Sequence, residues 1–570
     1  MSRLRYLIII GFSEERQEGA PAECPHLIHD DGWTRIYTDD PGAAWALPDR
    51  DGVLLGRIFP RNGVLPEGLA TNSMPLRDED LQASCWGDYL VVRSSQAARA
   101  SVYRPPGAAI PCYRRSEAEC TAIASDVSLL NIVFDKSPSI SWKGVGFQLV
   151  ANGLPAPTTG LAGVIEIERG TRLTVTRLGP HVERLWSPWD FVKPDYHLDQ
   201  TALAGLLRET VIECVRALAP SSETNILSLS GGLDSSIIAA AAAAAGFRPQ
   251  CFTMVDATPS GNEQHFAQAV AQHLGFDLDV RRYEMDDVDI VRPTYPNMPR
   301  PIGRVLGQTL IAARRAYRPQ TEPATLWTGI GGDNVFCFLH SASPVADSIV
   351  ARRWAGSWKT LLDVSRLSGA SVLQVGIAAL KRISRPPDYV WRPNMLFINA
   401  GWTDAHPVEL RHPWLEAPPG SRHGSAAHIA NVLQLQAGIE EPDAESGWEQ
   451  INPFLSQPVV ELCLGIPSWI WCAGGRDRAV ARAAFSPDLP AAIIDRRHKG
   501  GPEGFCIALL ERHRKVIREA LMEGNLAKQG LLDRQAIETA LADGARFKST
   551  EYLRLLELAD AEAWTNYWTN

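Results

Sequence analysis

The alternation of strands and helices around residues 225–274 is the feature that most restricts how this chain can fold. The predicted segments are the strand Asn225–Leu229, the alanine-rich helix Ser235–Ala245, the strand Gln250–Val255 and the helix Glu263–Leu274. Short connections join them, and a glycine turn lies between the first strand and its helix. Strand–helix units of this kind are typical of a parallel α/β sheet. We therefore predict such a sheet, preceded by an amphipathic helix over Leu198–Leu218.

The first third of the chain has a different texture, with short β runs separated by Gly and Pro. Examples are Tyr6–Ile10, Val53–Phe59, Tyr89–Arg93, Thr121–Ser125, Gly163–Glu168 and Thr171–Thr176. This spacing predicts an antiparallel, sheet-rich domain. A chain of 570 residues also exceeds what one core usually serves. We predict domains over 1–194 and 195–570, with a mostly helical region from about Trp354 onward.

Composition excludes several classes of protein. The net charge of −9 argues against a general nucleic-acid binder, and ten cysteines without a CxxC pair suggest reduced thiols rather than a zinc site or a disulfide scaffold. The apolar run Tyr6–Ile10 is too short for a secretory signal, and no stretch has the length of a membrane span. We expect a cytoplasmic protein whose partners include neither nucleic acid nor membrane.

The strongest chemical signal is the loop Ser230–Ser236, with the sequence SGGLDSS, between a strand and a helix start. Free backbone N–H groups and the positive end of a helix suit a bound phosphate there. Candidate phosphate-binding residues are Ser230, Gly231, Gly232, Ser235 and Ser236. Asp234 would repel phosphate directly, so we expect it to hold Mg²⁺. A purely structural turn is the alternative, which an acid inside the anion cradle disfavours.

Two further segments support this interpretation. Thr328–Asp333 is a glycine-rich turn directly after the apolar run Ala324–Trp327, a position where open α/β sheets bind ligands, and Asp333 could be a second Mg²⁺ carboxylate. Arg496–Gly501 is a cationic cluster in which Lys499 would stabilise departing pyrophosphate. Alone, each could equally be a plain turn or a solvated basic loop.

In their order and spacing, these three segments resemble the synthetase domain of the asparagine synthetase family. The likeness continues through Ile451–Leu455, Ile466–Pro467 and Leu489–Arg496, whereas Ser341–Gly447 matches poorly. The N-terminal part resembles the class II glutaminase domain of the same enzymes, on Trp86–Tyr89, Ala124–Asp126 and Gly163–Thr176. The resemblance implies an α+β, β-rich sandwich domain followed by an α/β ATP-pyrophosphatase domain with helical additions.

The resemblance also implies roles for individual residues. The loop around Asp234 would bind the phosphates of ATP, and Asp234 with Asp333 would bind Mg²⁺. Lys499 falls on the family lysine that contacts the α-phosphate and pyrophosphate. Leu229, Met254 and Gly329 fall where the family backbone cradles adenosine. Asp234, Asp333 and Lys499 are the implied catalytic residues, with ATP and Mg²⁺ as cofactors.

Two departures from the family pattern narrow the reaction. Ser2 stands where glutamine-hydrolysing members expose a cysteine, and the nearest thiol, Cys24, is far along the chain. A serine hydroxyl does not ionise as readily as a thiol, so we predict no glutaminase activity. Ile330 replaces the Glu of asparagine synthetase and the Tyr of β-lactam synthetase, and isoleucine cannot remove a proton.

A third group of relatives, the lasso-peptide macrocyclases, also lacks the glutaminase cysteine, and Gly329–Phe336 is similar to that group. The resemblance implies adenylation of an Asp or Glu side chain in a precursor peptide, followed by attack of the peptide's N-terminal amine and release of AMP and pyrophosphate. An α-amine has a pKa of about 7.7–8.0, so it depends less on an enzymic base than ammonium does. Glu449 and His498 are possible proton acceptors, and the base stays unassigned.

The expected partners are the precursor core peptide, a leader-peptide protease and a leader-recognition protein. Three other functions stay open. The chain could be a ligase that joins a small-molecule acid to free ammonia or another amine. It could form a β-lactam, which Ile330 disfavours. It could also be a catalytically inactive nucleotide-binding scaffold, which the presence of Asp234, Asp333 and Lys499 disfavours.

Overall fold

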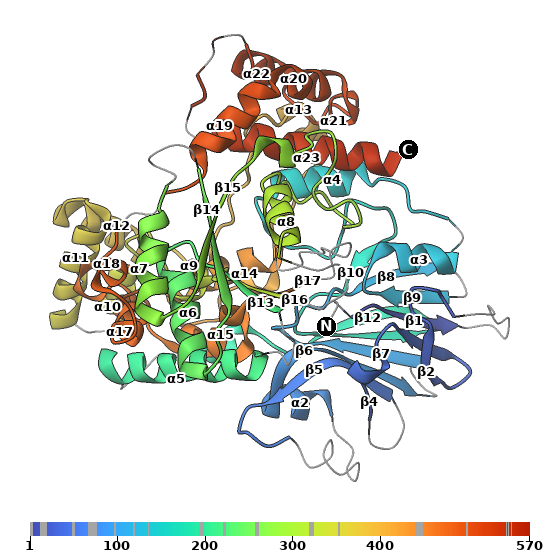
Figure 1. Cartoon of the computed structure of the whole chain (residues 1–570), viewed down its shortest axis with the longest axis horizontal. Coiled ribbons are helices and arrows are strands. Elements are labelled where there is room, and N and C mark those ends of the chain that lie inside the picture. The colour runs from blue at the N-terminus through green and yellow to red at the C-terminus, as the bar shows by residue number, and fades with distance from the viewer. Residues whose placement is uncertain are drawn as a thin grey trace.

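The fold is described from a computed structural model of the whole chain. The structure describes residues 4–11, 20–47, 52–65, 77–95, 99–117, 120–134, 136–192, 199–219, 224–256, 262–317, 324–351, 354–438, 448–497, 500–542, 544, 546–548 and 550–569. Three sheets and a large set of helices form a mixed α/β architecture (Figure 1). In these residues no helix combines the length and the apolar character needed to cross a bilayer.

Two six-stranded sheets are built from the N-terminal part of the chain, drawn mainly in blue and cyan in Figure 1. The first has the order β10 (Ile165–Glu166), β8 (Tyr113–Glu117), β9 (Cys120–Ala124), β1 (Tyr6–Gly11), β3 (Thr34–Thr38) and β2 (His26–Asp30). The second has the order β12 (Gly179–Arg184), β11 (Thr171–Thr176), β7 (Arg99–Arg104), β6 (Cys85–Ser95), β5 (Gly52–Pro60) and β4 (Ala44–Ala46). Neighbouring strands in both sheets run antiparallel, as the β-run spacing predicted.

Alternating side chains of the two sheets form a shared core. Tyr6, Ile8 and Ile10 point from β1 toward Leu90 and Val102 of the second sheet, and all belong to one buried cluster. Successive side chains of a strand face opposite sides of a sheet, so Leu7 and Ile9 face the other way. There they join a cluster with the helices α3 (Val127–Phe134) and α4 (Trp142–Val150).

The third sheet is parallel and five-stranded. Its order is β15 (Leu278–Arg282), β14 (Gln250–Val255), β13 (Thr224–Ser228), β16 (Ala324–Trp327) and β17 (Trp448–Ile451). The helices α5 (Gln200–Leu218), α6 (Leu233–Ala245), α7 (Gln264–Leu274) and α8 (Gly307–Arg315) belong to the same region. Two predicted strands, 250–255 and 324–327, match the structure to the residue. Sequence analysis did not predict β17, which lies in the region expected to be mostly helical.

The rest of the C-terminal region is helical, as predicted. Its helices are α9 (Gly332–Val335), α10 (Ser343–Val350), α11 (Trp354–Ser368), α12 (Val372–Ile383), α13 (Ala400–Ala405), α14 (His423–Gln436), α15 (Gln457–Gly465), α16 (Ser468–Trp471), α17 (Ala479–Phe485), α18 (Ala491–Ile494), α19 (Glu503–Arg512), α20 (Arg514–Glu523), α21 (Asn525–Lys528), α22 (Arg534–Ala540) and α23 (Glu551–Thr569). Helices α19 to α23, drawn in red in Figure 1, contribute Leu509, Leu521 and Leu558 to the cluster that covers the first sheet.

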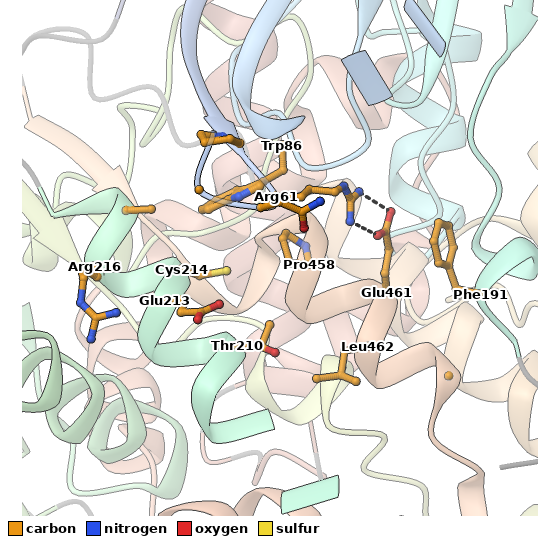
Figure 2. A pocket seen from close by; sticks show the side chains of 15 residues that line it. Arg61, Trp86, Phe191, Thr210, Glu213, Cys214, Arg216, Pro458, Glu461 and Leu462 are labelled. Atoms are coloured by element: carbon orange, nitrogen blue, oxygen red, sulfur yellow. Dashed lines mark hydrogen bonds and ion pairs between the residues drawn. The ribbon is translucent and has the colours of Figure 1, made fainter. Parts of the chain in front are cut away.

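The N-terminal sheets and the C-terminal region are therefore joined by shared cores. The predicted domain boundary at 194 falls in 193–198, outside the described residues. Ion pairs reinforce the junction. The Glu461 carboxylate accepts hydrogen bonds from Arg61 at 2.7 and 3.1 Å, from Trp186 Nε1 at 2.9 Å and from Gln457 Nε2 at 2.7 Å (Figure 2 shows the Arg61 pair).

Replacing Glu461 by alanine is expected to destabilise the protein, because the Arg61 guanidinium and the Trp186 N–H lose their shared acceptor. Breaking a buried pair from one side costs about 3 kcal/mol. We expect lower midpoints in both urea and thermal unfolding. The matched control is Glu213→Ala, an exposed residue beside the same cavity, which should leave both midpoints unchanged. Equal midpoints for Glu461→Ala and wild type would contradict the role given to this carboxylate.

Candidate active site at the edge of the parallel sheet

The SGGLDSS loop lies at the carboxyl end of β13, in the middle of the parallel sheet. Helix α6 begins at Leu233, two residues before its predicted start, which places Asp234 and Ser235 in the first helical turn. Gly231 has φ +69°, and a Cβ there would lie 2.5 Å from Ala267 N. Only glycine fits this position, and the turn brings the loop against α7.

The serines of this loop hold its conformation. Ser235 Oγ accepts a hydrogen bond from Ser230 N at 3.2 Å and lies 3.1 Å from Ser230 Oγ. Ser236 is fully buried, and its hydroxyl donates to Gly232 O at 2.7 Å. Gly232 occupies the N-cap of α6 and has no side chain with which to satisfy the first N–H groups. Those donors and the positive helix end suit an anion.

The second loop, Thr328–Asp333, packs directly on the first. It follows β16, the neighbour of β13 in the sheet. A Cβ on Gly329 would lie 2.5 Å from Ser235 N and 2.7 Å from Asp234 C, so a glycine is required for the two loops to meet. Because the carboxyl ends of parallel strands share one edge, residues 99 positions apart in the sequence become neighbours.

Asp234 and Asp333 converge on a single nitrogen atom. Arg478 Nη1 donates to Asp234 Oδ1 at 3.0 Å and to Asp234 Oδ2 at 3.1 Å, and it also donates to Asp333 Oδ1. Burial works against the charge of Arg478, but Asp234, Asp333 and Asp477 outweigh it and raise the pKa of the guanidinium. A cation therefore lies at the point that both carboxylates face.

Arg478 is a site residue that sequence analysis missed. It has φ +50° at the N-cap of α17, and its guanidinium lies 5.1 Å from the centre of the Phe338 ring. Arg478 Nε donates a hydrogen bond to Asp477 Oδ1 at 2.8 Å. The segment has a glycine pair, Gly474-Gly475, but no strand precedes it, whereas the other two loops each follow a strand of the parallel sheet. Only its tertiary contacts mark it.

The described ends of the predicted basic segment also reach the first loop. Arg496 Nη1 donates to Gly231 O at 2.8 Å, and its guanidinium lies 3.9 Å from the centre of the Phe266 ring. Arg496 and the backbone N–H of Gly500 both donate to the Glu263 carboxylate. His498 and Lys499 lie outside the described residues, so the role given to Lys499 stays a prediction.

The three residues expected to cradle adenosine come from neighbouring strands. Leu229 follows β13, is fully buried and donates its N–H to Phe252 O at 2.8 Å. Met254 lies on β14, and Gly329 follows β16. The sheet order β14–β13–β16 puts these positions side by side at the edge that carries both loops.

The residues available for proton transfer are few. Ile330 is exposed on the second loop, where its backbone N–H donates to Thr328 Oγ1 at 3.1 Å. Glu449 lies on β17 and forms an ion pair with Arg57 of β5. Burial raises the pKa of Glu449, and Arg57 opposes that shift. This carboxylate helps to join the two parts of the chain, and the base remains unassigned.

The thiols are not placed for nucleophilic catalysis. Nine of the ten cysteines are buried and Cys120 is half-buried. Cys24 is fully buried, and burial raises the pKa of its thiol to about 12. A thiol must ionise and be reached by its substrate to act as a nucleophile. Ser2 lies outside the described residues.

A separate cavity of about 870 Å³ lies where β5, β6, α5 and α15 meet (Figure 2). Arg61, Trp86, Phe191, Thr210 and Pro458 are among its lining residues. The predicted nucleotide-binding residues are not part of its lining. Its walls come from both parts of the chain, and the Arg61–Glu461 pair forms one side.

Comparison with known proteins agrees with the parallel sheet and its loops. The family pattern described as asparagine synthase matches residues 203–568. The chain belongs to the asparagine synthase family. Members of this family are ATP-dependent, AMP-forming carbon–nitrogen ligases that use ATP, usually with Mg²⁺. No curated protein matches the chain.

Two solved structures align weakly. One, described as the allosteric regulatory enzyme of purine biosynthesis, is 11% identical with a TM-score of 0.19, over 49% of this chain and 74% of that one. The other, glutamine phosphoribosylpyrophosphate amidotransferase from B. subtilis in complex with ADP and GMP, is 11% identical with a TM-score of 0.18, over 59% of this chain and 71% of that one. Similarities this low say nothing further about the fold.

The donor set fits Mg²⁺. Two aspartates at one position offer the hard oxygen ligands that this ion prefers, and Mg²⁺ is usually held by one or two carboxylates together with substrate phosphates. Among the described residues, no group of three or more His, Cys, Asp or Glu side chains could hold a metal ion. The nucleotide and water would therefore supply the remaining ligands.

Gly329→Ala is expected to separate the two loops, because its methyl group would overlap the backbone of Ser235 and Asp234. A misplacement of about 1 Å in a catalytic constellation can lower the rate about 100-fold. We expect a loss of that order in ATP–pyrophosphate exchange. Gly205→Ala on α5 is the matched control, because this glycine is exposed and a Cβ there meets nothing within 4 Å among the described residues. Normal exchange by Gly329→Ala would contradict the packing of the loops.

Arg478 and a divalent cation should compete for the same carboxylates. In the nucleotide-free protein, Arg478→Ala is therefore expected to tighten Mn²⁺ binding by about tenfold, the equivalent of one partly buried ion pair. Electron paramagnetic resonance of free Mn²⁺ measures this directly. Arg476→Ala, which removes a more exposed arginine paired with Asp495, should have no effect. Weaker Mn²⁺ binding by Arg478→Ala would show that the carboxylates do not form a metal site.

Proposed function

We propose that this protein is an ATP-dependent peptide macrocyclase. It would adenylate an Asp or Glu side chain of a precursor peptide and join that carbonyl to the N-terminal amine of the same peptide, with release of AMP and pyrophosphate. The observation that carries this proposal is the convergence of Asp234 and Asp333 beside the phosphate-binding loop. That geometry supports an adenylating ligase of the asparagine synthase family.

The choice of nucleophile follows from what surrounds the site. The described thiols are buried or half-buried, which argues against a glutamine-derived ammonia supply. Ile330 occupies the place where relatives carry a Glu or Tyr for proton removal. An N-terminal α-amine has a pKa of about 7.7–8.0 and is substantially neutral near pH 8. Such an amine can attack a mixed anhydride with little help from an enzymic base.

The proposed reaction has two displacements. An oxygen of the substrate carboxylate attacks the α-phosphorus of ATP, and the bond to the β-phosphate oxygen breaks with loss of pyrophosphate. The amine nitrogen then attacks the acyl carbon, AMP leaves and the nitrogen loses a proton. Mg²⁺ held by Asp234 and Asp333 would neutralise the charge that develops on the phosphates. The first turn of α6 would orient the phosphates through its N–H groups.

Synthetic peptides test the proposal without a protease. A library carrying one Asp or Glu and a free amino terminus is incubated with enzyme and ATP, and mass spectrometry seeks the loss of one water. We expect AMP to form without glutamine, and ring formation to rise with pH to a midpoint near 8, because only the neutral amine attacks. Asp234→Ala should abolish both AMP and ring.

The same peptides with an acetylated amino terminus form the decisive control. They should still support ATP–pyrophosphate exchange, since the carboxylate is intact, but they should form no ring. Formation of ADP, a strict need for glutamine, or amidation by added ammonia in place of ring closure would each contradict the macrocyclase. The leader-peptide protease and leader-recognition protein remain proposed partners that would supply the free amine in the cell.

A further inference from the structure

Helices α10, α11 and α12 form a layer at the edge of the molecule, far from the two antiparallel sheets (left side of Figure 1). Val345, Ala346 and Val364 pack with Val375 and Ala379 of α12 in a small core of their own. The layer belongs to the region, 341–447, that matched the asparagine synthetase pattern poorly. It has no part in the reaction proposed above.

Helix α12 has a second apolar face that the fold leaves uncovered. Leu373, Ile377 and Leu380 are 72%, 45% and 63% exposed. Their spacing of i, i+4 and i+7 aligns them along one side of the helix. The stripe adjoins the buried face of Val375 and Ala379, so the apolar arc of α12 is wider than its own protein covers. Such a stripe marks an interaction surface.

Gly376 lies beside this stripe in the middle of the helix. A glycine there weakens a helix relative to alanine, so its presence needs a reason. A Cβ at Gly376 would meet nothing within 4 Å among the described residues, so packing inside the protein does not require glycine. Close approach of another backbone from outside would require it.

The exposed charges of the described residues between 341 and 385 have one sign. The sequence from 341 to 385 contains seven Lys or Arg residues and two Asp residues, in a chain with a net charge of −9. Among its described residues, the exposed charged side chains are all cations, namely Lys359, Arg366, Lys381, Arg382 and Arg385. Asp347 and Asp363 are buried and accept hydrogen bonds from the backbone N–H groups of Gly424 and Gly474.

We propose that the Leu373–Ile377–Leu380 face of α12 binds an acidic amphipathic helix of a partner protein. The stripe extends for about 10 Å, which matches two turns of one helix. Acidic side chains flanking the apolar residues of the partner would pair with Lys381, which lies one turn from Ile377 at the border of the stripe. This inference does not depend on the proposed reaction.

Charge disfavours a second copy of this chain as the occupant. An antiparallel pair of α12 helices would place Lys381 of each copy against the amino end of the other helix, which carries partial positive charge. A parallel pair would bring the same cations together. An acidic helix avoids both repulsions.

The surface is connected to the candidate active site. Gly474 N donates to Asp363 Oδ2 of α11 at 3.1 Å, and Gly475 packs against the Arg366 side chain. These glycines belong to η8 (Ala473–Gly475), three residues before Arg478. A partner bound to this layer would therefore lie near the segment that carries Arg478.

The probe is a designed helical peptide with Leu at positions spaced i, i+4 and i+7 and Glu on both flanks, compared with the same peptide carrying Lys. Fluorescence anisotropy with the full-length protein should show binding of the Glu peptide and at least about tenfold weaker binding of the Lys peptide. Ile377→Ser should weaken the Glu peptide about tenfold. Lys381→Glu should remove the preference for the Glu peptide.

Gly376→Ala separates docking from stability. It should leave the Tm of the free protein equal or higher, because alanine favours the helix, while weakening the Glu peptide. Val182→Ser, on an exposed valine of β12 in the second sheet, is the matched control and should change neither property.

Four results would overturn the proposal. They are equal binding of the Glu and Lys peptides, binding that Ile377→Ser leaves unchanged, sedimentation with phosphatidylserine vesicles that Ile377→Ser abolishes, and a dimer in light scattering that Ile377→Ser dissociates. The third would assign the surface to a membrane and the fourth to a second copy. None of them would alter the measurement of AMP formation.

Discussion

Two carboxylates facing one point at the edge of the parallel sheet are the constraint on which the rest of the active region depends. Two carboxylates that face one point repel each other, so a cation between Asp234 and Asp333 stabilises the pair. Arg478 supplies it in the free protein. A metal ion with nucleotide phosphates would supply it during turnover. Gly329 is required because a side chain there would keep the two loops apart, and Gly231 is required because a side chain there would overlap α7.

The N-terminal sheets support the C-terminal region through packing and ion pairs. Their cysteines are buried or half-buried, and the first sheet shares one buried cluster with α4 and the helices at the C-terminal end of the chain. Arg57 and Arg61 also neutralise two glutamates of the C-terminal region, Glu449 and Glu461. Removing this half would expose apolar clusters and leave buried charges without partners.

The helical layer that ends in α12 adds a surface with different physical requirements. A core side chain is held by the side chains around it, whereas Leu373 and Leu380 remain largely exposed to water. Among the described residues of the layer, the exposed charged side chains are all cations. Such a combination costs solubility and gives the isolated chain no stability. A partner that covers the apolar stripe and pairs with the cations would account for this surface, which lies close to the segment that positions Arg478.

The sequence by itself determined what local patterns encode. The alternation of strands and helices predicted β14 to the residue, and the apolar run before a glycine-rich turn did the same for β16. Because both loops follow parallel strands, the sequence also predicted that Asp234 and Asp333 lie close together. Only the tertiary structure revealed the place of Arg478 in the site, the Arg57–Glu449 ion pair and the edge strand β17. The reason is physical: β17 has two polar residues, Glu449 and Gln450, between its apolar ends and therefore lacks the apolar run that marked β16, and a lone arginine looks like any solvated charge. Each is defined by a partner more than a hundred residues away, a contact that no local pattern records.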